Sequence, residues 1–317
     1  MELLRQKKMG GFSMSNRRTF LKQSLLGGSA LSLGIFPNEL FASGELLKLT
    51  VMHTNDIHCH IDPFDDSHAE YAGRGGMIRF ASLVSKCRSE SPNLLLLDAG
   101  DMFQGTPYFN YFKGDLILKL MSQIGYDAGT IGNHEFDNGL PDILSALRFA
   151  KFPMVSSNYD FTDTILADSV KPWHILEKGG IKIGIYGLGI ELEGLVGKLN
   201  YGNTQYLDPL ATALKMERLL KKDHKCDLVI CLSHLGYSYA NRKISDVSLA
   251  PQTKYTDLII GGHSHTFLDK PTVLENAKGN QILVNQAGWA ALAAGKIEFI
   301  FDRARRRKAF SSTVNNL

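Results

Sequence analysis

Short apolar runs alternate with helix-like segments from residue 45 onward, and this alternation limits the folds open to the chain. The runs include "LLKLTVMHT", "NLLLLDAG", "IKIGIYGL", "CDLVICLSH" and "DLIIGGH". The helix-like segments lie between them, at residues 76–90, 114–124, 140–150 and 207–223. Strands in turn with helices, joined by short connections, are typical of α/β proteins. We therefore expect a single domain over residues 45–317, with an α/β or layered α-β-β-α arrangement.

The first 44 residues differ from the rest of the chain. "SNRRTFLKQ" precedes the apolar run "LLGGSALSLGIF", the layout of a twin-arginine signal peptide in which Arg17 and Arg18 are the paired arginines. The apolar run is shorter than the ~20 residues that cross a bilayer, so we expect no stable membrane span. We expect cleavage after Gly44 and export to the periplasm, with a basic leader of no such function as the alternative. Translation could begin at Met1 or at Met14.

This leader accounts for the net positive charge of the chain. Of the 35 basic and 32 acidic residues, six bases and two acids lie in the first 44 residues, so residues 45–317 carry 29 bases and 30 acids. A domain with a net charge of −1 offers no electrostatic reason to bind nucleic acid or a membrane surface. The local exception is "RARRRK" at 303–308, which we interpret as a solvated turn.

Four cysteines in a protein expected to be exported raise the question of disulfides. Cys226 and Cys231 lie in one predicted strand, where a rise of about 3.3 Å per residue places them too far apart to bridge. Cys59 and Cys87 are candidate partners, and the sequence leaves this pairing open. The cysteine spacing resembles no zinc site.

Side chains that can bind metal ions follow five of the predicted strands. Because the carboxyl ends of parallel strands meet at one edge of a sheet, we expect these side chains to converge. An Asp-x-His turn, a Gly-Asp turn or a single loop histidine is common by itself, but five such strand ends together indicate a site. The seven side chains are Asp56, His58, Asp101, Asn133, His234, His263 and His265.

Seven ligands are too many for one tetrahedral ion and suit two ions. Imidazole and carboxylate groups suit zinc, manganese or iron, because none of these ligands is a soft thiolate. One carboxylate can bridge two cations about 3.5–4 Å apart. Asp101 is the natural bridge, because a neighbouring glycine lets the backbone come close. We therefore expect two divalent ions that share Asp101.

Five motifs in this order carry a family resemblance: "HTNDIH", "GD", "GNHEFD", "SHLG" and "GGHSH". They resemble those of the calcineurin-like metallophosphoesterases, and specifically of the bacterial 5′-nucleotidase and UDP-sugar hydrolase family. "KPW" at 171–173 and "NQAGWAALAAGKIEF" also resemble that family, so the likeness covers nearly all of residues 45–317. The resemblance implies a four-layer α-β-β-α sandwich. It also implies hydrolysis of phosphate monoesters, 5′-nucleotides or related nucleotide esters, by attack of a metal-bound hydroxide.

The resemblance also implies residue roles. Two overlapping sets of ligands would each hold one ion: Asp56, His58, Asp101 and His265, and then Asp101, Asn133, His234 and His263. His134 would face the phosphoryl group and, when protonated, help the leaving oxygen depart or hold a phosphoryl oxygen. Asp137, about one helical turn later, could orient the imidazole of His134. We expect Glu135 to be a turn or structural acid, His53 a core or supporting histidine, and Cys59 a packing residue.

Two other functions stay open at this point. One is a metal-bearing binding protein without turnover, although the retention of His134 and Asp137 argues against it. The other is a sulfur-ester hydrolase of the thiosulfohydrolase type, from the same superfamily.

The resemblance raises one further expectation, about a partner. In the 5′-nucleotidase family a second domain usually follows the metal domain and clamps the base, and the chain ends at Leu317, soon after "GKIEFIFD". We therefore expect weak selectivity among small phosphate esters, and a separate chain that could supply a nucleotide-binding domain. That chain could dock at "MFQGTPYFNYF", residues 102–112, unless this stretch packs on its own domain.

Overall fold

The computed structural model describes Phe41 and residues 46–317. The expected signal peptide, its paired arginines and the cleavage point after Gly44 lie outside the described residues. Within the described part of the chain, no helix combines the length and the hydropathy that crossing a membrane requires.

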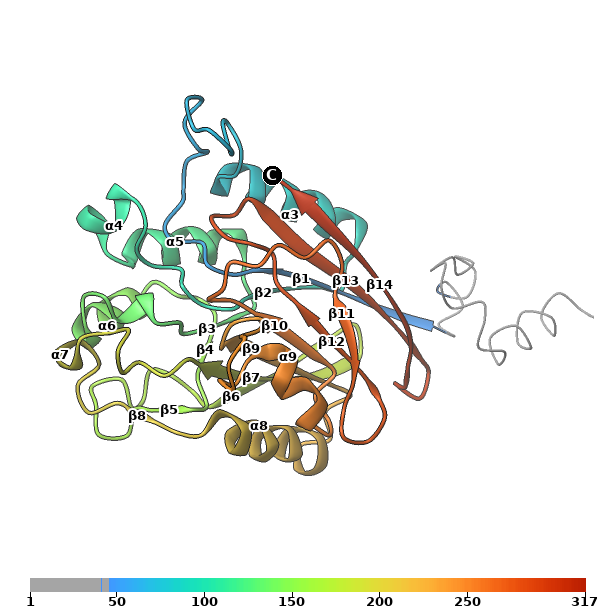
Figure 1. Ribbon diagram of the computed structural model, residues 1–317. Coiled ribbons are helices and arrows are strands. Elements are labelled where there is room, and N and C mark those ends of the chain that lie inside the picture. The colour runs from blue at the N-terminus through green and yellow to red at the C-terminus, as the bar shows by residue number, and fades with distance from the viewer. Residues whose placement is uncertain (1–40, 42–45) are drawn as a thin grey trace, which may run out of the picture. The chain divides into compact units, whose positions relative to one another are not determined.

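The first sheet has six strands, in the order β14-β13-β1-β2-β3-β4 (Figure 1). Parallel pairing joins four of them: β1 (Leu46–Thr54), β2 (Leu94–Asp98), β3 (Ala128–Thr130) and β4 (Met154–Val155). Antiparallel pairing adds the last two strands of the chain beside β1: β13 (Ala293–Asp302) and β14 (Arg307–Asn316). All five residues of β2 are buried, as expected of a continuous apolar run in a strand that is covered on both faces.

The second sheet also has six strands, in the order β11-β12-β10-β9-β7-β6. Its central strands are parallel: β7 (Ile181–Gly189), β9 (Leu228–His234), β10 (Leu258–Gly261) and β12 (Gln281–Asn285). Its edges are antiparallel: β6 (Trp173–Lys178) and β11 (Thr272–Glu275). A separate two-stranded sheet pairs β5 (Tyr159–Asp160) with β8 (Gln205–Tyr206).

Side chains of β2 alternate between two cores, because successive residues of a strand point to opposite faces. Leu95 and Leu97 belong to a buried cluster that also contains Ile185 and Ile230 of the second sheet, so the two sheets pack face to face. Leu96 points the other way, into a cluster with residues of the helices that cover the first sheet. The sheets therefore form the two inner layers of the domain.

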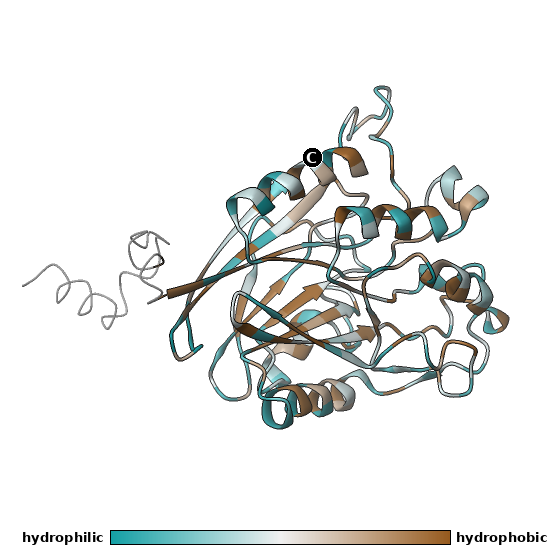
Figure 2. Ribbon diagram, turned by 180° about the vertical axis from the view of Figure 1, so that it is seen from behind, coloured by the Kyte–Doolittle hydropathy of each residue, from teal (hydrophilic) through white to brown (hydrophobic). Residues whose placement is uncertain are grey.

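Helices form the outer layers. The first sheet is covered by α3 (Met77–Glu90), α5 (Asp115–Ile124) and α6 (Leu140–Leu147), and the second by α8 (Pro209–Arg218), which continues into the π-helical turn η2 (Leu219–Asp223). Figure 2 shows mainly hydrophobic strands in the middle and helices of mixed hydropathy outside them, as a layered fold requires. The predicted four-layer α-β-β-α sandwich is confirmed, and all four predicted helices form within a few residues of the expected bounds.

Sequence analysis did not predict the short helices. These are α4 (Pro107–Phe112), η1 (His134–Phe136), α7 (Lys198–Tyr201), α9 (Asp246–Leu249) and η3 (Ala250–Gln252). The helix α4 lies within the aromatic stretch 102–112. Phe103 and Phe109 are buried in their own domain, whereas Tyr111 and Phe112 remain exposed. The packing alternative for this stretch is therefore correct for Phe103 and Phe109 and wrong for Tyr111 and Phe112.

Several smaller predictions can also be compared with the structure. All four cysteines are buried and free, so the candidate bridge between Cys59 and Cys87 does not form. His53 is a core histidine: Asn285 donates a hydrogen bond to its Nε2 over 2.8 Å, and burial lowers the pKa of His53 to about 3. The basic run "RARRRK" spans the hairpin turn between β13 and β14 and the first two residues of β14. Arg306 and Lys308 pair with Asp302, each over about 3 Å.

Candidate metal centre

The seven candidate ligands follow strand ends from both sheets. Asp56 and His58 follow β1, Asp101 follows β2, and Asn133 follows β3. His234 is the last residue of β9 in the second sheet. His263 and His265 lie directly after β10, so the site forms where the carboxyl ends of strands from the two packed sheets meet.

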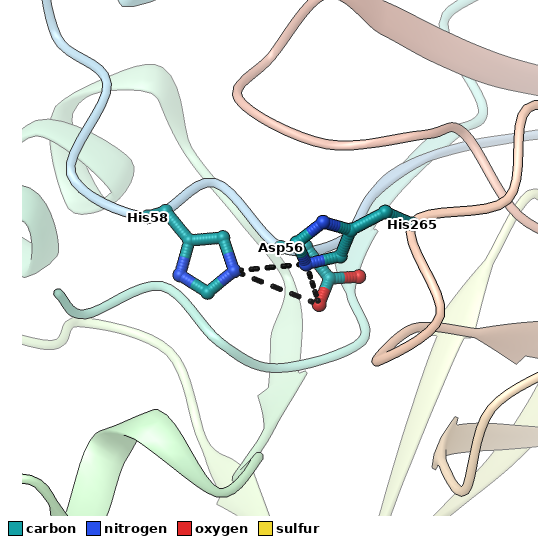
Figure 3. Close-up of side chains that lie close together, drawn as sticks. All are labelled: Asp56, His58 and His265. Atoms are coloured by element: carbon teal, nitrogen blue, oxygen red, sulfur yellow. Dashed lines mark hydrogen bonds and ion pairs between the residues drawn. The ribbon is translucent and has the colours of Figure 1, made fainter. Parts of the chain in front are cut away.

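The first group of ligands consists of Asp56, His58 and His265, whose ligand atoms all lie within 4.8 Å of one another (Figure 3). Nε2 of His58 is 3.1 Å from Nε2 of His265. Oδ1 of Asp56 is 3.3 Å from Nε2 of His265 and 3.9 Å from Nε2 of His58. Two imidazole nitrogens and a carboxylate oxygen thus face a common point.

The second group consists of Asp101, His234 and His263, again with ligand atoms within 4.8 Å of one another. Oδ2 of Asp101 lies 2.9 Å from Nε2 of His234. Asn133 joins this group through its amide oxygen, which is 2.8 Å from Nδ1 of His263. The structure thus brings all seven predicted side chains into two adjacent groups.

The two groups are linked by their acidic members. Oδ1 of Asp56 is 3.9 Å from Nε2 of His234, so this carboxylate of the first group also approaches the second. Asp101 contacts His234, and its negative charge also acts on His58. Burial lowers the pKa of His58, and among the influences that raise this pKa the charge of Asp101 is the strongest. Both carboxylates therefore lie between the groups.

Backbone strain marks the same residues. Five candidate ligands have positive φ angles, a backbone conformation that residues other than glycine rarely adopt. They are Asp56 (52°), His58 (50°), Asp101 (56°), His263 (71°) and His265 (51°). Each such residue costs on the order of 1–3 kcal/mol and persists only where its surroundings enforce it. Strain of this kind concentrates at functional sites, which supports a ligand-binding role for these loops.

Glycines allow the loops to approach one another. Gly100 has a φ of 91°, and a Cβ atom on it would lie 2.7 Å from the backbone nitrogen of Gly132. A Cβ atom on Gly132 would collide with Oδ1 of Asp101. The close approach of these two loops therefore needs both glycines.

The tautomers of two histidines suit metal binding. Nδ1 of His58 is 3.1 Å from the carbonyl oxygen of Phe103, and Nδ1 of His234 is 2.7 Å from that of Ala99. A carbonyl can only accept, so each Nδ1 carries the hydrogen and each Nε2 of the neutral ring offers a lone pair. Nε2 of His234 is buried and makes no hydrogen bond of suitable geometry with any described residue, although Asp101 is near. A cation would satisfy this nitrogen, so the residues present fit a metal.

The charges of the site also suit a cation. Burial alone would raise the pKa of Asp101, but the neighbouring His234 outweighs burial and holds that pKa well below its usual range. Burial opposes the charged form of His234 as well, yet Asp101 raises the pKa of His234 to about 10. Burial lowers the pKa of His263 to about 4, which keeps this ring neutral and able to ligate. Metal binding would displace the proton that the charged ring of His234 carries on Nε2.

His134 and Asp137 lie at the rim of the centre as a hydrogen-bonded pair. Nδ1 of His134 is 2.8 Å from Oδ2 of Asp137, and this bond is the main reason why the pKa of His134 rises to about 9. The backbone N–H of His134 donates to Oδ1 of Asp101 over 2.8 Å. The ring is part-exposed and lies 5.2 Å from that of His58, measured between centroids.

Glu135, predicted to be structural, is the buried anchor of two ligand loops. Its Oε1 accepts the backbone N–H groups of Met102 and Phe103, and its Oε2 accepts those of Asp101 and Gly132. One carboxylate thus ties the loop after β2 to the loop after β3.

Two supporting side chains were missed by sequence analysis. Asn55 donates to Oδ2 of Asp56 over 2.7 Å and to the carbonyl of Gly288. Gln286 donates to the carbonyl of Gly262 and to Asp246, and its oxygen accepts the N–H of Thr266, so it braces the loop that carries two of the candidate histidine ligands. Both lie inside stretches that carry the family resemblance, "HTNDIH" and "NQAGWAALAAGKIEF", but their supporting roles depend on partners that lie mostly far away along the chain.

Comparison with known proteins agrees with this architecture. The family model of the calcineurin-like phosphoesterases matches residues 49–267. A snake venom 5′-nucleotidase from Gloydius brevicauda is 32% identical over 280 residues, which cover 80% of this chain and 45% of that protein. The crystal structure of a 5′-nucleotidase precursor from Thermus thermophilus superposes with a TM-score of 0.78 at 32% identity, covering 85% of this chain and 54% of the other.

A more distant structure shares only the fold. The sulfate thiohydrolase SoxB of Thermus thermophilus superposes with a TM-score of 0.69 at 14% identity, over 84% of this chain and 56% of the other. The chain spans about half the length of such relatives. Because the family model covers more than half of the chain, and the fold and the strand-end motifs agree with it, the chain belongs to the calcineurin-like phosphoesterase family.

Proposed function

We propose that the chain is a dimetal phosphoesterase that hydrolyses phosphate monoesters, including 5′-nucleotides. The observation that carries this proposal is the pair of adjacent ligand groups, with a protonated histidine at their rim. The 5′-nucleotidases among its relatives support the nucleotide as substrate.

Seven residues would hold the two ions. Asp56, His58, Asp101 and His265 form one set, and Asp101, Asn133, His234 and His263 form the other, with Asp101 shared. Such ligands suit zinc, manganese or iron. Two bound divalent cations would supply Lewis acidity, which neutralises phosphate charge and acidifies water.

His134 would act on the substrate directly. Its Nδ1–H donates to Asp137, so the proton on Nε2 remains available to a phosphoryl oxygen or to the leaving oxygen. Asp137 fixes the orientation of the ring and favours its charged form. Positive charge is thereby held at the rim, where negative charge develops during displacement.

The direct test is hydrolysis of p-nitrophenyl phosphate by the purified chain, loaded in turn with zinc, manganese or iron. We expect turnover with at least one metal and none after Asp101→Ala. A chain that binds metal but releases no p-nitrophenol or AMP-derived phosphate would be a binding protein. Faster turnover of a thiosulfate-type ester than of any phosphate ester would favour the sulfur-ester alternative.

We also propose export to the periplasm by the twin-arginine route, on the strength of Arg17 and Arg18 in "SNRRTFLKQ". Replacing both arginines by lysine should leave active protein inside the cell. Normal amounts of the double variant in the periplasm would contradict this route. Neither the relatives nor the structure supports the separate nucleotide-binding chain, and it forms no part of the proposal.

A further inference from the structure

A pocket of about 590 Å³ lies beside the metal centre, between the loop that follows β1 and the helix α4. The loop contributes residues 60–65 and 68 to its lining, and the α4 region contributes 106–108, 111 and 112. In Figure 1 this loop and α4 lie near the same end of the molecule as α5. The volume falls within the range of about 300–1,000 Å³ that is usual for small-molecule sites.

This pocket is physically joined to the metal centre. His60, which lines it, lies two residues after the candidate ligand His58, and Oγ1 of Thr106 donates to the carbonyl of Cys59 over 2.8 Å. On the other side, the ring of Trp289 stacks on the candidate ligand His265, with centroids 5.5 Å apart and an interplanar angle of 5°. Trp289 also contacts Phe64 of the pocket at 5.6 Å. A substrate could therefore reach from the metal centre into the pocket.

Flat rings dominate the lining of the pocket. His60 stacks on Phe64 with centroids 4.7 Å apart. From α4, Tyr111 is 82% exposed and Phe112 is 50% exposed. Exposed aromatic rings grouped at a concave surface are a feature of sites that bind apolar or aromatic ligands. Such rings offer stacking faces to a planar ligand.

The charges of the pocket exclude a second phosphate as its occupant. Asp62 and Asp65 line it, and none of its described lining residues is a lysine or an arginine. Tyr108 donates its hydroxyl to Oδ2 of Asp62 over 2.6 Å, so polar groups are present for hydrogen bonding. Carboxylate oxygens accept from amino groups such as those on adenine or cytosine. The pocket therefore suits a neutral planar group with amino substituents.

We propose that this pocket binds the nucleoside part of a 5′-nucleotide whose phosphate lies at the metal centre. The inference rests on the proposed phosphoesterase function and adds a specificity site within the same chain. It replaces the expectation of weak selectivity with a preference for nucleotides over base-free esters. A quaternary ammonium group would also suit aromatic rings and carboxylates, but it would leave most of the volume empty.

Binding of adenosine to the metal-free chain tests the pocket without any hydrolysis. Trp289 is one of two tryptophans, so its fluorescence can report on a ligand beside Phe64. We expect saturable quenching by adenosine that is lost in the variant Tyr111→Ala/Phe112→Ala. Val273→Ala is a matched control, because this 45% exposed residue lies on the edge strand β11, outside the pocket. Equal quenching in the double variant and in the wild type would overturn the assignment.

Kinetics of the metal-loaded chain provide the second test. The ratio of kcat/KM for AMP to kcat/KM for ribose 5-phosphate, which lacks the base, should exceed one and fall about tenfold or more in the double variant. Val273→Ala should keep the wild-type ratio. A ratio near one in the wild type, with no adenosine binding, would overturn the inference alone and leave the phosphoesterase function standing. A preference for phosphocholine over AMP would assign the pocket to a quaternary ammonium group instead.

The two claims fail in different ways. If adenosine binds as expected but no phosphate ester is hydrolysed with any metal, the pocket assignment is supported and the proposed function is refuted. If p-nitrophenyl phosphate is hydrolysed but adenosine does not bind, the reverse holds.

Discussion

Replacing Glu135 by Gln should loosen the metal centre without touching a ligand. Glu135 is 2% exposed, and each oxygen of its carboxylate accepts two backbone N–H groups. Gln has nearly the same shape but only one acceptor oxygen, and its amide nitrogen would face two N–H donors. Whichever way the amide is turned, two of the four N–H groups lose their acceptor.

The size of the effect follows from that count. Leaving a buried donor unpaired costs about 1–3 kcal/mol, so two such donors cost roughly 2–6 kcal/mol. Domains are typically stable by about 5–15 kcal/mol, so the variant would lose a large fraction of its free energy of unfolding. The two affected loops, which follow β2 and β3, carry Asp101 and Asn133, so metal affinity should fall as well.

Urea unfolding of the metal-free wild type and of Glu135→Gln measures the first effect, and metal titration measures the second. Glu217→Gln is a matched control, because Glu217 is also buried and accepts the backbone N–H groups of Lys254, Tyr255 and Thr256, away from the ligands. Only Glu135→Gln should lose metal affinity, and its loss of stability should exceed that of Glu217→Gln, in which an amide oxygen in the place of Oε2 keeps all three N–H groups. A loss of stability below about 1 kcal/mol in Glu135→Gln, with metal affinity unchanged, would refute the anchoring role.

Three further substitutions and a chelator test the remaining roles. Asp101→Ala should remove activity and most bound metal, as metal analysis can show; near-normal metal content would disprove its shared role. His134→Ala should keep its metal and lose about 10²-fold or more in kcat, and loss of metal instead would make His134 a ligand. In a plot of kcat against pH, Asp137→Asn should shift the fall in activity on the alkaline side to lower pH. The reason is that protonated His134 is lost as pH rises through its pKa of about 9, and the bond to Asp137 is the main cause of that elevation; a fall that stays at the same pH would exclude this pair as the titrating group. Chelation should abolish hydrolysis of p-nitrophenyl phosphate and a divalent metal should restore it, whereas activity that survives exhaustive chelation would count against a metal enzyme.

The convergence of the seven candidate ligands could be predicted because its signal is local. Each candidate ligand ends or closely follows an apolar run that is long enough to be a strand, and parallel strands place such ends at the same edge of a sheet. His134 and Asp137 lie within a single turn, so their pairing also follows from spacing. The structure adds that five of the candidate ligands have a strained backbone, which residue identity alone does not reveal.

The supporting contacts could not be predicted because they join distant segments. Asn55 binds Gly288, which is 233 residues away, and Gln286 binds Asp246, which is 40 residues away. Nor does a sequence pattern show that β13 returns to pair with β1, with Leu46 opposite Asp302. The helix α4 was missed because six residues are too few for a helical period to stand out, although Pro107 occupies its first turn.

The central claim is that two ions act together at the two ligand groups, and a metal titration of the chelated chain tests it most directly. Bound metal per chain and the rate of p-nitrophenyl phosphate hydrolysis would be measured on the same samples as divalent metal is added. If each of the two candidate groups binds one ion and both ions are needed, the rate should reach its plateau only when two ions are bound per chain. A plateau reached with one ion per chain, or a full rate with none, would contradict the dimetal account.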